Sequence, residues 1–119
     1  MLDKTLGLVV TNVVLLVAGQ ILWKTGVNRL GSLDLSALPR LFVSPWIWGG
    51  ILLFGAATVI WLAALSRAAL STLYPLQSLA YILGMAAGVV LFHEKVSWTG
   101  WFGGCLILIG IYLIAKSGL

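Results

Sequence analysis

The sequence predicts an all-α fold, a bundle of four transmembrane helices that forms a single integral membrane domain over residues 1–119. Its composition predicts a membrane location, because 61% of the residues are hydrophobic and only 8% are charged, whereas soluble domains carry about 25% charged residues. Four apolar runs follow one another with short segments between them, and about 20 such residues span a bilayer as a helix. The expected spans cover about residues 5–24, 45–66, 68–92 and 96–116.

The longest connection, residues 32–44, carries helix start signals. Asp34 or Ser36 is expected to cap a short interfacial helix that runs through Phe42. Pro45 suits the first turn of the second span, because its missing N–H has no partner there in any case. Residues after Lys24 break the apolar pattern, so the first span is expected to end near that lysine.

The other two connections are short. The turn around Arg67 predicts that the second and third spans are antiparallel neighbours. In the equally tight turn before the fourth span, Glu94 is expected to hold the turn or cap a helix, with proton coupling as the alternative. Ser97, or a residue beside it, is expected to cap the fourth span.

Basic residues are spread almost evenly over the two ends of the bundle. An even number of spans places both termini on one side, and the seven Lys and Arg residues then give almost no positive-inside bias. Insertion in both orientations is therefore one interpretation, and a single orientation set by other features is the alternative. The side of the termini carries Lys4, Arg67 and Lys116, and the other side carries Lys24, Arg29, Arg40 and Lys95.

The third span carries a polar stripe. Four polar residues fall at i, i+3, i+4 and i+7, which places them on one face of a continuous helix. A polar face is costly against lipid, so this stripe lines a cavity or packs against another helix, and Trp61 of the second span is a candidate aromatic wall. The stripe consists of Tyr74, Gln77, Ser78 and Tyr81, with Pro75 near its start.

The first span holds Gln20 and Lys24, which are four residues apart and share a face. They are candidates for binding a polar or anionic headgroup; the alternatives are interhelical hydrogen bonding for Asn12 and Gln20 and snorkelling for Lys24. Arg67 extends the polar region to the membrane surface. Because no span contains an acidic residue in its interior, the charges suit an anionic substrate better than a cation.

Neither a catalytic nor a metal-binding set of residues is recognisable, so an enzyme, a metal site and a cofactor are not expected. Cys105 is interpreted as a small buried apolar residue. Glycines are expected to mark helix packing and dimer contacts, because small residues let membrane helices approach closely. These glycines are Gly84, Gly88, Gly100, Gly103, Gly104 and Gly110.

Three segments resemble the drug/metabolite transporter superfamily, in its small multidrug resistance-like and EamA-like four-helix members. The matching residues are Gly19, Gln20, Lys24 and Gly26; Trp61, Ser66, Arg67, Ser71, Tyr74 and Pro75; and His93, Glu94, Gly100, Gly104 and Gly110. The resemblance implies an antiparallel dimer joined largely through the fourth helix, with the site between helices one to three of both copies. The multidrug members carry Glu where this chain has Leu16, which argues against cation/proton antiport of their type.

The Gly19–Gln20 pair, the 70–75 segment and the His93–Glu94 turn are most similar to the aminoarabinose–undecaprenyl phosphate flippase subunits. This resemblance implies translocation of a polyprenyl-phosphate-linked sugar, or another anionic or polar small substrate, across the cell inner membrane. It also implies a membrane lipid as binding partner and a homodimer or a heterodimer with a related four-helix chain, with no role for nucleic acid. A small-cation exporter and a non-transporting assembly subunit are the alternatives.

Overall fold

The computed structural model describes residues 2–31 and 34–118, in which every regular element is a helix. Four helical segments are long and apolar enough to cross a membrane, namely Lys4–Leu30, Pro45–Leu65, Leu70–Phe92 and Trp98–Gly118. The all-α fold with four spans is therefore confirmed. The elements are α1 (Leu2–Leu30), η1 (Leu35–Ala37), α2 (Leu38–Leu41), α3 (Pro45–Leu65), α4 (Leu70–Leu76), α5 (Leu79–Phe92) and α6 (Trp98–Gly118).

Helix α1 continues six residues past Lys24, so the expected end of the first span was wrong. The extension packs against the start of α3: Gly26 lies against the Trp46 side chain, and the Arg29 guanidinium lies 5.0 Å from the centre of the Trp46 ring. Gly26 thus allows a close helix contact instead of breaking the helix. The helix ends at Leu30, and Gly31 follows it with a positive φ of 82°, which favours glycine.

The third span is two helices, not one continuous helix as predicted. Pro75 lies inside α4, and a proline there lacks the N–H that continues the hydrogen-bond ladder. The chain crosses the break in tight turns, in which the Ser78 N–H donates to the Pro75 carbonyl at 3.0 Å and the Tyr81 N–H donates to the Ser78 carbonyl at 2.9 Å. The Ser78 hydroxyl also donates to the Pro75 carbonyl.

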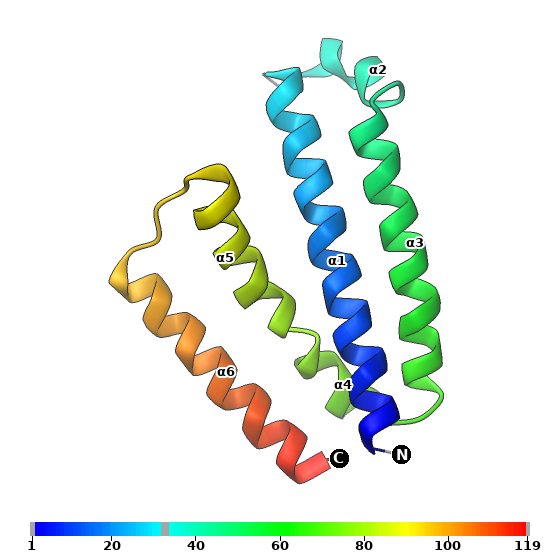
Figure 1. The fold of residues 1–119 in the computed structure, drawn as a ribbon, viewed down its shortest axis with the longest axis vertical. Helices are drawn as coiled ribbons and strands as arrows, with labels where there is room; N and C mark the ends of the chain where they lie inside the picture. The colour runs from blue at the N-terminus through cyan, green and yellow to red at the C-terminus, as the bar shows by residue number, and fades with distance from the viewer. Residues whose placement is uncertain (1, 32–33, 119) are drawn as a thin grey trace.

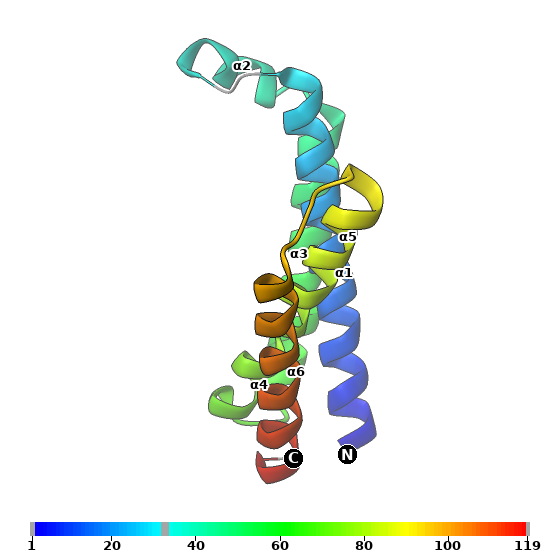
Figure 2. The ribbon, with the colours of Figure 1, turned by 90° about the vertical axis from the view of Figure 1, so that its left-hand side faces the viewer.

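The helices form a flattened layer of 48 × 35 × 21 Å (Figures 1 and 2). Helix α1 packs against α3 on one side and against α5 on the other, while α6 packs at the edge against α4 and α5. The second and third spans are therefore not neighbours along their length, which corrects the expectation from the short Arg67 turn. The first turn of α1 and the last turn of α6 lie at the same end, as an even number of spans requires (Figure 1).

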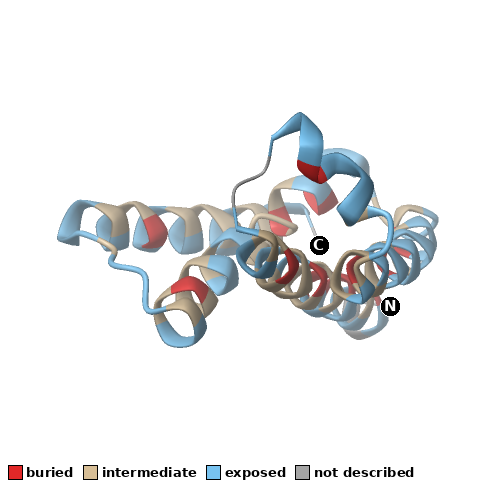
Figure 3. Ribbon diagram, turned by 90° about the horizontal axis from the view of Figure 1, so that it is seen from above, coloured by how far each residue is buried: buried red, intermediate tan, exposed pale blue. Residues whose placement is uncertain are grey.

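The buried core is small and lies where α1 meets α3 and α4. Its members are Val9, Val13, Ala64, Leu73 and Leu76. Buried positions are few, and they face neighbouring helices while exposed residues cover the outside of the layer (Figure 3). Helix α6 is the least covered, with 6% of its most apolar window buried, against 28% for α1. Cys105, expected to be buried, is exposed on α6.

The local capping predictions are confirmed. Asp34 caps η1 by accepting from the Ala37 N–H at 3.1 Å, and the Ser36 hydroxyl, which donates to the same carboxylate at 2.6 Å, lowers the pKa of Asp34. Pro45 opens α3, and the Ser97 hydroxyl accepts from the Gly100 N–H at 3.2 Å. The segment with α2 projects sideways from the layer at the end opposite the termini (Figure 2).

Candidate functional site

A cavity of about 480 Å³ lies between α1, the break between α4 and α5, and the segment that follows α5. Its volume is within the range of about 300–1,000 Å³ that is typical of small-molecule sites. Apolar residues such as Leu16, Ile21, Phe54 and Phe92 form much of its wall. Its polar lining consists of Gln20, Lys24, Tyr74, Gln77, Ser78, Tyr81 and Glu94.

Most of the substrate-binding residues predicted from the sequence line this one cavity. Gln20 and Lys24 reach it from α1, and the polar stripe of the third span reaches it although the helix breaks between Gln77 and Ser78. Two predicted residues do not line it. Trp61 packs behind the cavity with its ring 6.4 Å from that of Tyr74. Arg67 is exposed in the turn between α3 and α4, so its binding role stays a prediction for a different surface.

The tyrosines connect the cavity with the outside of the bundle. Tyr74 is 62% exposed and Tyr81 is 67% exposed, and both line the cavity. In a membrane-spanning segment such exposure means contact with lipid or with a partner chain. The cavity is therefore open beside these tyrosines, toward lipid or toward a partner chain. An opening toward lipid allows a headgroup inside the protein while an attached apolar chain stays in the bilayer.

Asn12 fixes the orientation of the Gln77 amide. Asn12 is 1% exposed; its Nδ2 donates to the Ala57 carbonyl at 2.8 Å, and its Oδ1 accepts from Gln77 Nε2 at 2.9 Å. Because a backbone carbonyl can only accept, Asn12 must turn its nitrogen to Ala57 and its oxygen to Gln77. The Gln77 amide, which lines the cavity, is therefore held with its Nε2 toward Asn12. The interhelical hydrogen bonding considered for Asn12 is confirmed.

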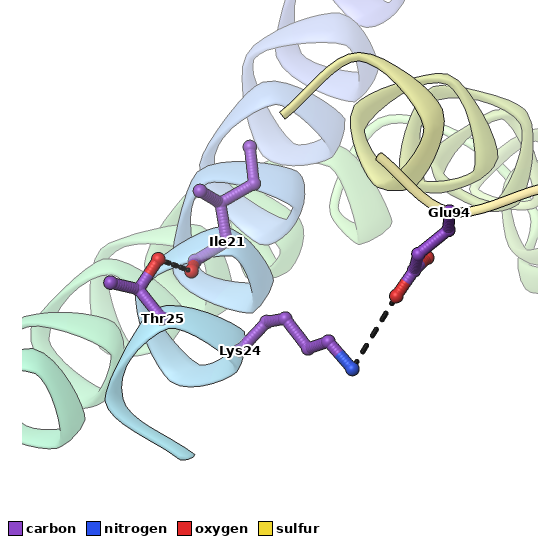
Figure 4. A network of polar contacts seen from close by, with 4 residues as sticks. All are labelled: Ile21, Lys24, Thr25 and Glu94. Carbon is purple, nitrogen blue, oxygen red and sulfur yellow. Dashed lines mark hydrogen bonds and ion pairs between the residues drawn. The ribbon is translucent and has the colours of Figure 1, made fainter. Parts of the chain in front are cut away.

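Lys24 and Glu94 form an ion pair at the cavity, with 3.4 Å between Nζ and Oε2 (Figure 4). The two side chains reach toward each other from α1 and from the segment after α5, and each is 48% exposed. On the same turn of α1, the Thr25 hydroxyl donates to the Ile21 carbonyl at 2.8 Å and so has its hydrogen bond within its own helix. Glu94 is thus a lining residue of the cavity as well as a turn residue.

The end of α5 directs Glu94 into the cavity. His93 adopts a left-handed conformation with φ 57° and ends the helix, and its N–H donates to the Gly88 carbonyl. The Glu94 N–H donates to the same carbonyl at 3.0 Å. A Cβ at Gly88 would overlap the Glu94 carboxylate at its present position, so a larger residue there would displace the end of this flexible side chain.

Sequence reasoning placed Glu94 in the turn and missed its place in the cavity. One signal was present: Lys24 and Glu94 lie at the ends of spans that meet the same side of the membrane, which allows the two to pair. The left-handed turn that folds Glu94 back over Gly88 has no comparable signal, because His93 is a non-glycine residue with positive φ.

The glycines predicted to pack helices fall into two groups. Gly88, Gly100 and Gly104 have neighbours within the chain, respectively Glu94, Val96, and the Ile82 and Met85 side chains. A Cβ at Gly84, Gly103 or Gly110 would meet nothing within 4 Å. The close contact between α1 and α3 instead uses Gly19 and Gly50, which lie against Phe54 and Trp23. Among the described residues no cluster of three His, Cys, Asp or Glu could hold a metal ion.

Comparison with known proteins identifies relatives across most of the chain. A probable 4-amino-4-deoxy-L-arabinose-phosphoundecaprenol flippase subunit ArnE of Pseudomonas fluorescens is 31% identical over 99 residues, which cover 83% of this chain and 86% of the relative. The ArnE of Aeromonas salmonicida is 32% identical over 82% of this chain and 84% of the relative. A probable subunit ArnF of Proteus mirabilis is 29% identical over 91% of this chain and 89% of the relative.

No family model matches the chain, and no solved structure matches it. The two ArnE relatives exceed 30% identity over more than four fifths of their own length. The four membrane-length helices agree with this relationship. The chain therefore belongs to the family of the ArnE flippase subunits.

Proposed function

We propose that the chain is a subunit of a flippase that moves a polyprenyl-phosphate-linked amino sugar across the bacterial inner membrane. The observation that carries the proposal is the cavity itself, which combines the Lys24–Glu94 ion pair with uncharged polar groups and is open beside the exposed Tyr74 and Tyr81. Lys24 is the only cationic side chain among the residues that line it. A lysine is a suitable partner for a phosphate oxygen, while Gln20, Gln77 and Ser78 offer hydrogen bonds to sugar hydroxyls.

The names of the relatives support the same substrate class. Each is called a probable subunit of a flippase for 4-amino-4-deoxy-L-arabinose-phosphoundecaprenol. A subunit implies a partner, and the exposed α6 leaves room for a second copy or a related four-helix chain. A cation exporter is less well supported, because the position of the exporters' membrane carboxylate is the apolar Leu16 at the cavity wall.

The first prediction concerns Lys24. Replacing it by Gln removes the positive charge that meets phosphate, and a hydrogen bond to a charged group contributes about 1.5–3 kcal/mol. We expect Lys24→Gln to weaken binding of polyprenyl-phosphate aminoarabinose by about tenfold to a hundredfold. The measurement is native mass spectrometry of the protein in mild detergent, purified with any chain that accompanies it, during titration with the lipid.

Lys95→Gln is the matched control, because Lys95 is exposed near Glu94 and does not line the cavity. It removes the same charge from the same end of the bundle and should leave lipid binding unchanged. Equal losses in both variants would indicate a general electrostatic effect of the surface and contradict the proposed site. Retention of quaternary cations in place of the lipid would favour the exporter.

A further inference from the structure

We propose that Glu94 recognises an amino group on the transported headgroup, so that Lys24 and Glu94 together select a zwitterionic substrate. This inference rests on the proposed function and assigns a specificity-determining role to a residue of the same cavity. In the free protein the two side chains neutralise each other at 3.4 Å. When the substrate binds, its phosphate takes the place of Glu94 beside Lys24, and its ammonium group takes the place of Lys24 beside Glu94.

Backbone hydrogen bonds fix the turn that carries Glu94. Two consecutive N–H groups, of His93 and Glu94, donate to the Gly88 carbonyl and hold the turn against the end of α5. The carboxylate lies over Gly88, in the space that a Cβ on that residue would occupy. The arrangement thus directs a negative charge into the cavity.

The ion pair is of a kind that a substrate can replace. Both side chains are 48% exposed, and ion pairs at such positions contribute little net stability. Separating the two side chains when a substrate binds therefore costs little free energy, provided that each charge gains a new partner of opposite charge. A pair buried on all sides would resist separation much more strongly.

Charge complementarity then discriminates between headgroups. A headgroup with a phosphate and no amine would engage Lys24 and leave the Glu94 carboxylate close to the phosphate without a cation, which is unfavourable. A headgroup with both charges satisfies both side chains. Specificity of this kind depends on the penalty imposed on the wrong ligand as much as on attraction of the right one.

The test compares two lipids that differ at one group. One is polyprenyl-phosphate-linked 4-amino-4-deoxyarabinose, and the other carries a hydroxyl in place of the amine. Wild-type protein, with any chain that co-purifies, is expected to bind the amino lipid at least about tenfold more tightly in native mass spectrometry, as for a charged hydrogen bond. Glu94→Gln should abolish this preference by weakening binding of the amino lipid and by sparing or improving binding of the hydroxyl lipid.

Gly88→Ala provides a second variant that keeps the carboxylate and displaces it. It should reduce the preference in the same direction, whereas Gly55→Ala on α3 should not, because a Cβ there meets nothing within 4 Å and the residue does not line the cavity. In every variant, retained binding of the hydroxyl lipid serves as the control that the site is still folded.

The outcomes separate the two proposals. If Glu94→Gln keeps the wild-type preference, or if wild-type protein binds the two lipids equally, the role of Glu94 is overturned while the proposed function stands. If wild-type protein binds neither lipid, the proposed function fails and the role of Glu94 fails with it. A purely structural role for Glu94 would lower binding of both lipids in parallel and leave their ratio unchanged, which also overturns the inference.

Discussion

Asn12 links three helices through a single buried side chain. It joins the backbone of α3 at Ala57 to the Gln77 amide at the break between α4 and α5. A buried amide must have its hydrogen bonds satisfied, especially where no water replaces them. The two bonds therefore hold α1 against α3 and, at the same time, fix the orientation of the Gln77 amide in the cavity wall.

Asn12→Leu keeps the approximate volume and removes both bonds, so we expect it to destabilise the protein by about 1–3 kcal/mol. We also expect weaker headgroup binding, because the Gln77 amide is then free to rotate. The measurements are the unfolding midpoint in mixed detergent micelles titrated with SDS, and lipid binding by native mass spectrometry. The control is Thr11→Val, since the exposed Thr11 hydroxyl bonds only the Gly7 carbonyl of its own helix. Wild-type behaviour of Asn12→Leu in both measurements would contradict this role.

At the level of elements, the contact between α1 and α3 depends on two facing glycines. An ideal Cβ on Gly50 would lie 3.0 Å from the Gly19 carbonyl oxygen and would overlap the Trp23 indole. That indole stacks on Phe54 at 4.4 Å, and its Nε1–H donates to the Ile47 carbonyl at 3.0 Å. The glycines let the helices approach until the aromatic rings fill the space beside them. Phe54 in turn forms part of the cavity wall.

Gly50→Ala should therefore destabilise the protein by about 1–3 kcal/mol, because the added methyl group displaces the Trp23 ring. Gly55→Ala, on the same helix, meets nothing within 4 Å and should be neutral or stabilise by up to about 1 kcal/mol through helix propensity. SDS titration of the two variants beside the wild type measures both effects. The interpretation fails if Gly50→Ala and Gly55→Ala shift the midpoint alike.

The spans and their caps could be predicted from the sequence because they depend on local rules. Lipid forces an apolar run of sufficient length to be a helix, and Asp34, Pro45 and Ser97 act within one turn of their own positions. The shared face of Gln20 and Lys24 follows from helix geometry in the same way. Such features need no knowledge of which helices touch.

The order of the helices could not be predicted, because in these spans apolar residues face lipid as readily as they face protein. Placing α1 between α3 and α5 depends on the fit of Gly19 to Gly50 and on the bond from Asn12 to Gln77, which are visible only in three dimensions. The place of Glu94 in the cavity likewise depends on the left-handed turn at His93. The extent of a span can be read from the local sequence. Which helices it contacts depends on the fit between side chains that are far apart in the sequence.

At the scale of the whole molecule, the protomer is a flat layer whose last helix, α6, has few contacts with the rest of the chain. Gly103 and Gly110 are seven residues apart on α6, which places them on one face, and neither has a neighbour that a Cβ would meet within 4 Å. The two glycines are half-buried, and the exposed Phe102 and Tyr112 lie on other sides of the same helix. Small residues on a membrane helix permit close approach of another helix. We therefore expect this face of α6 to meet a second copy or a related four-helix chain.

Gly110→Leu is expected to weaken this association without unfolding the protomer, because a Cβ at this position meets nothing within 4 Å in its own chain. Overpacking of a helix contact costs about 1–3 kcal/mol, which corresponds to about a fivefold to hundredfold rise in the dissociation constant. Native mass spectrometry across a range of detergent dilutions measures the proportions of monomer and dimer. Gly55→Leu makes the same change at an open position on α3, the helix on the opposite edge of the layer from α6, and should leave the proportions unchanged. A dimer that survives Gly110→Leu and dissociates with Gly55→Leu would place the interface on α3, and the flat layer would then associate through its other edge.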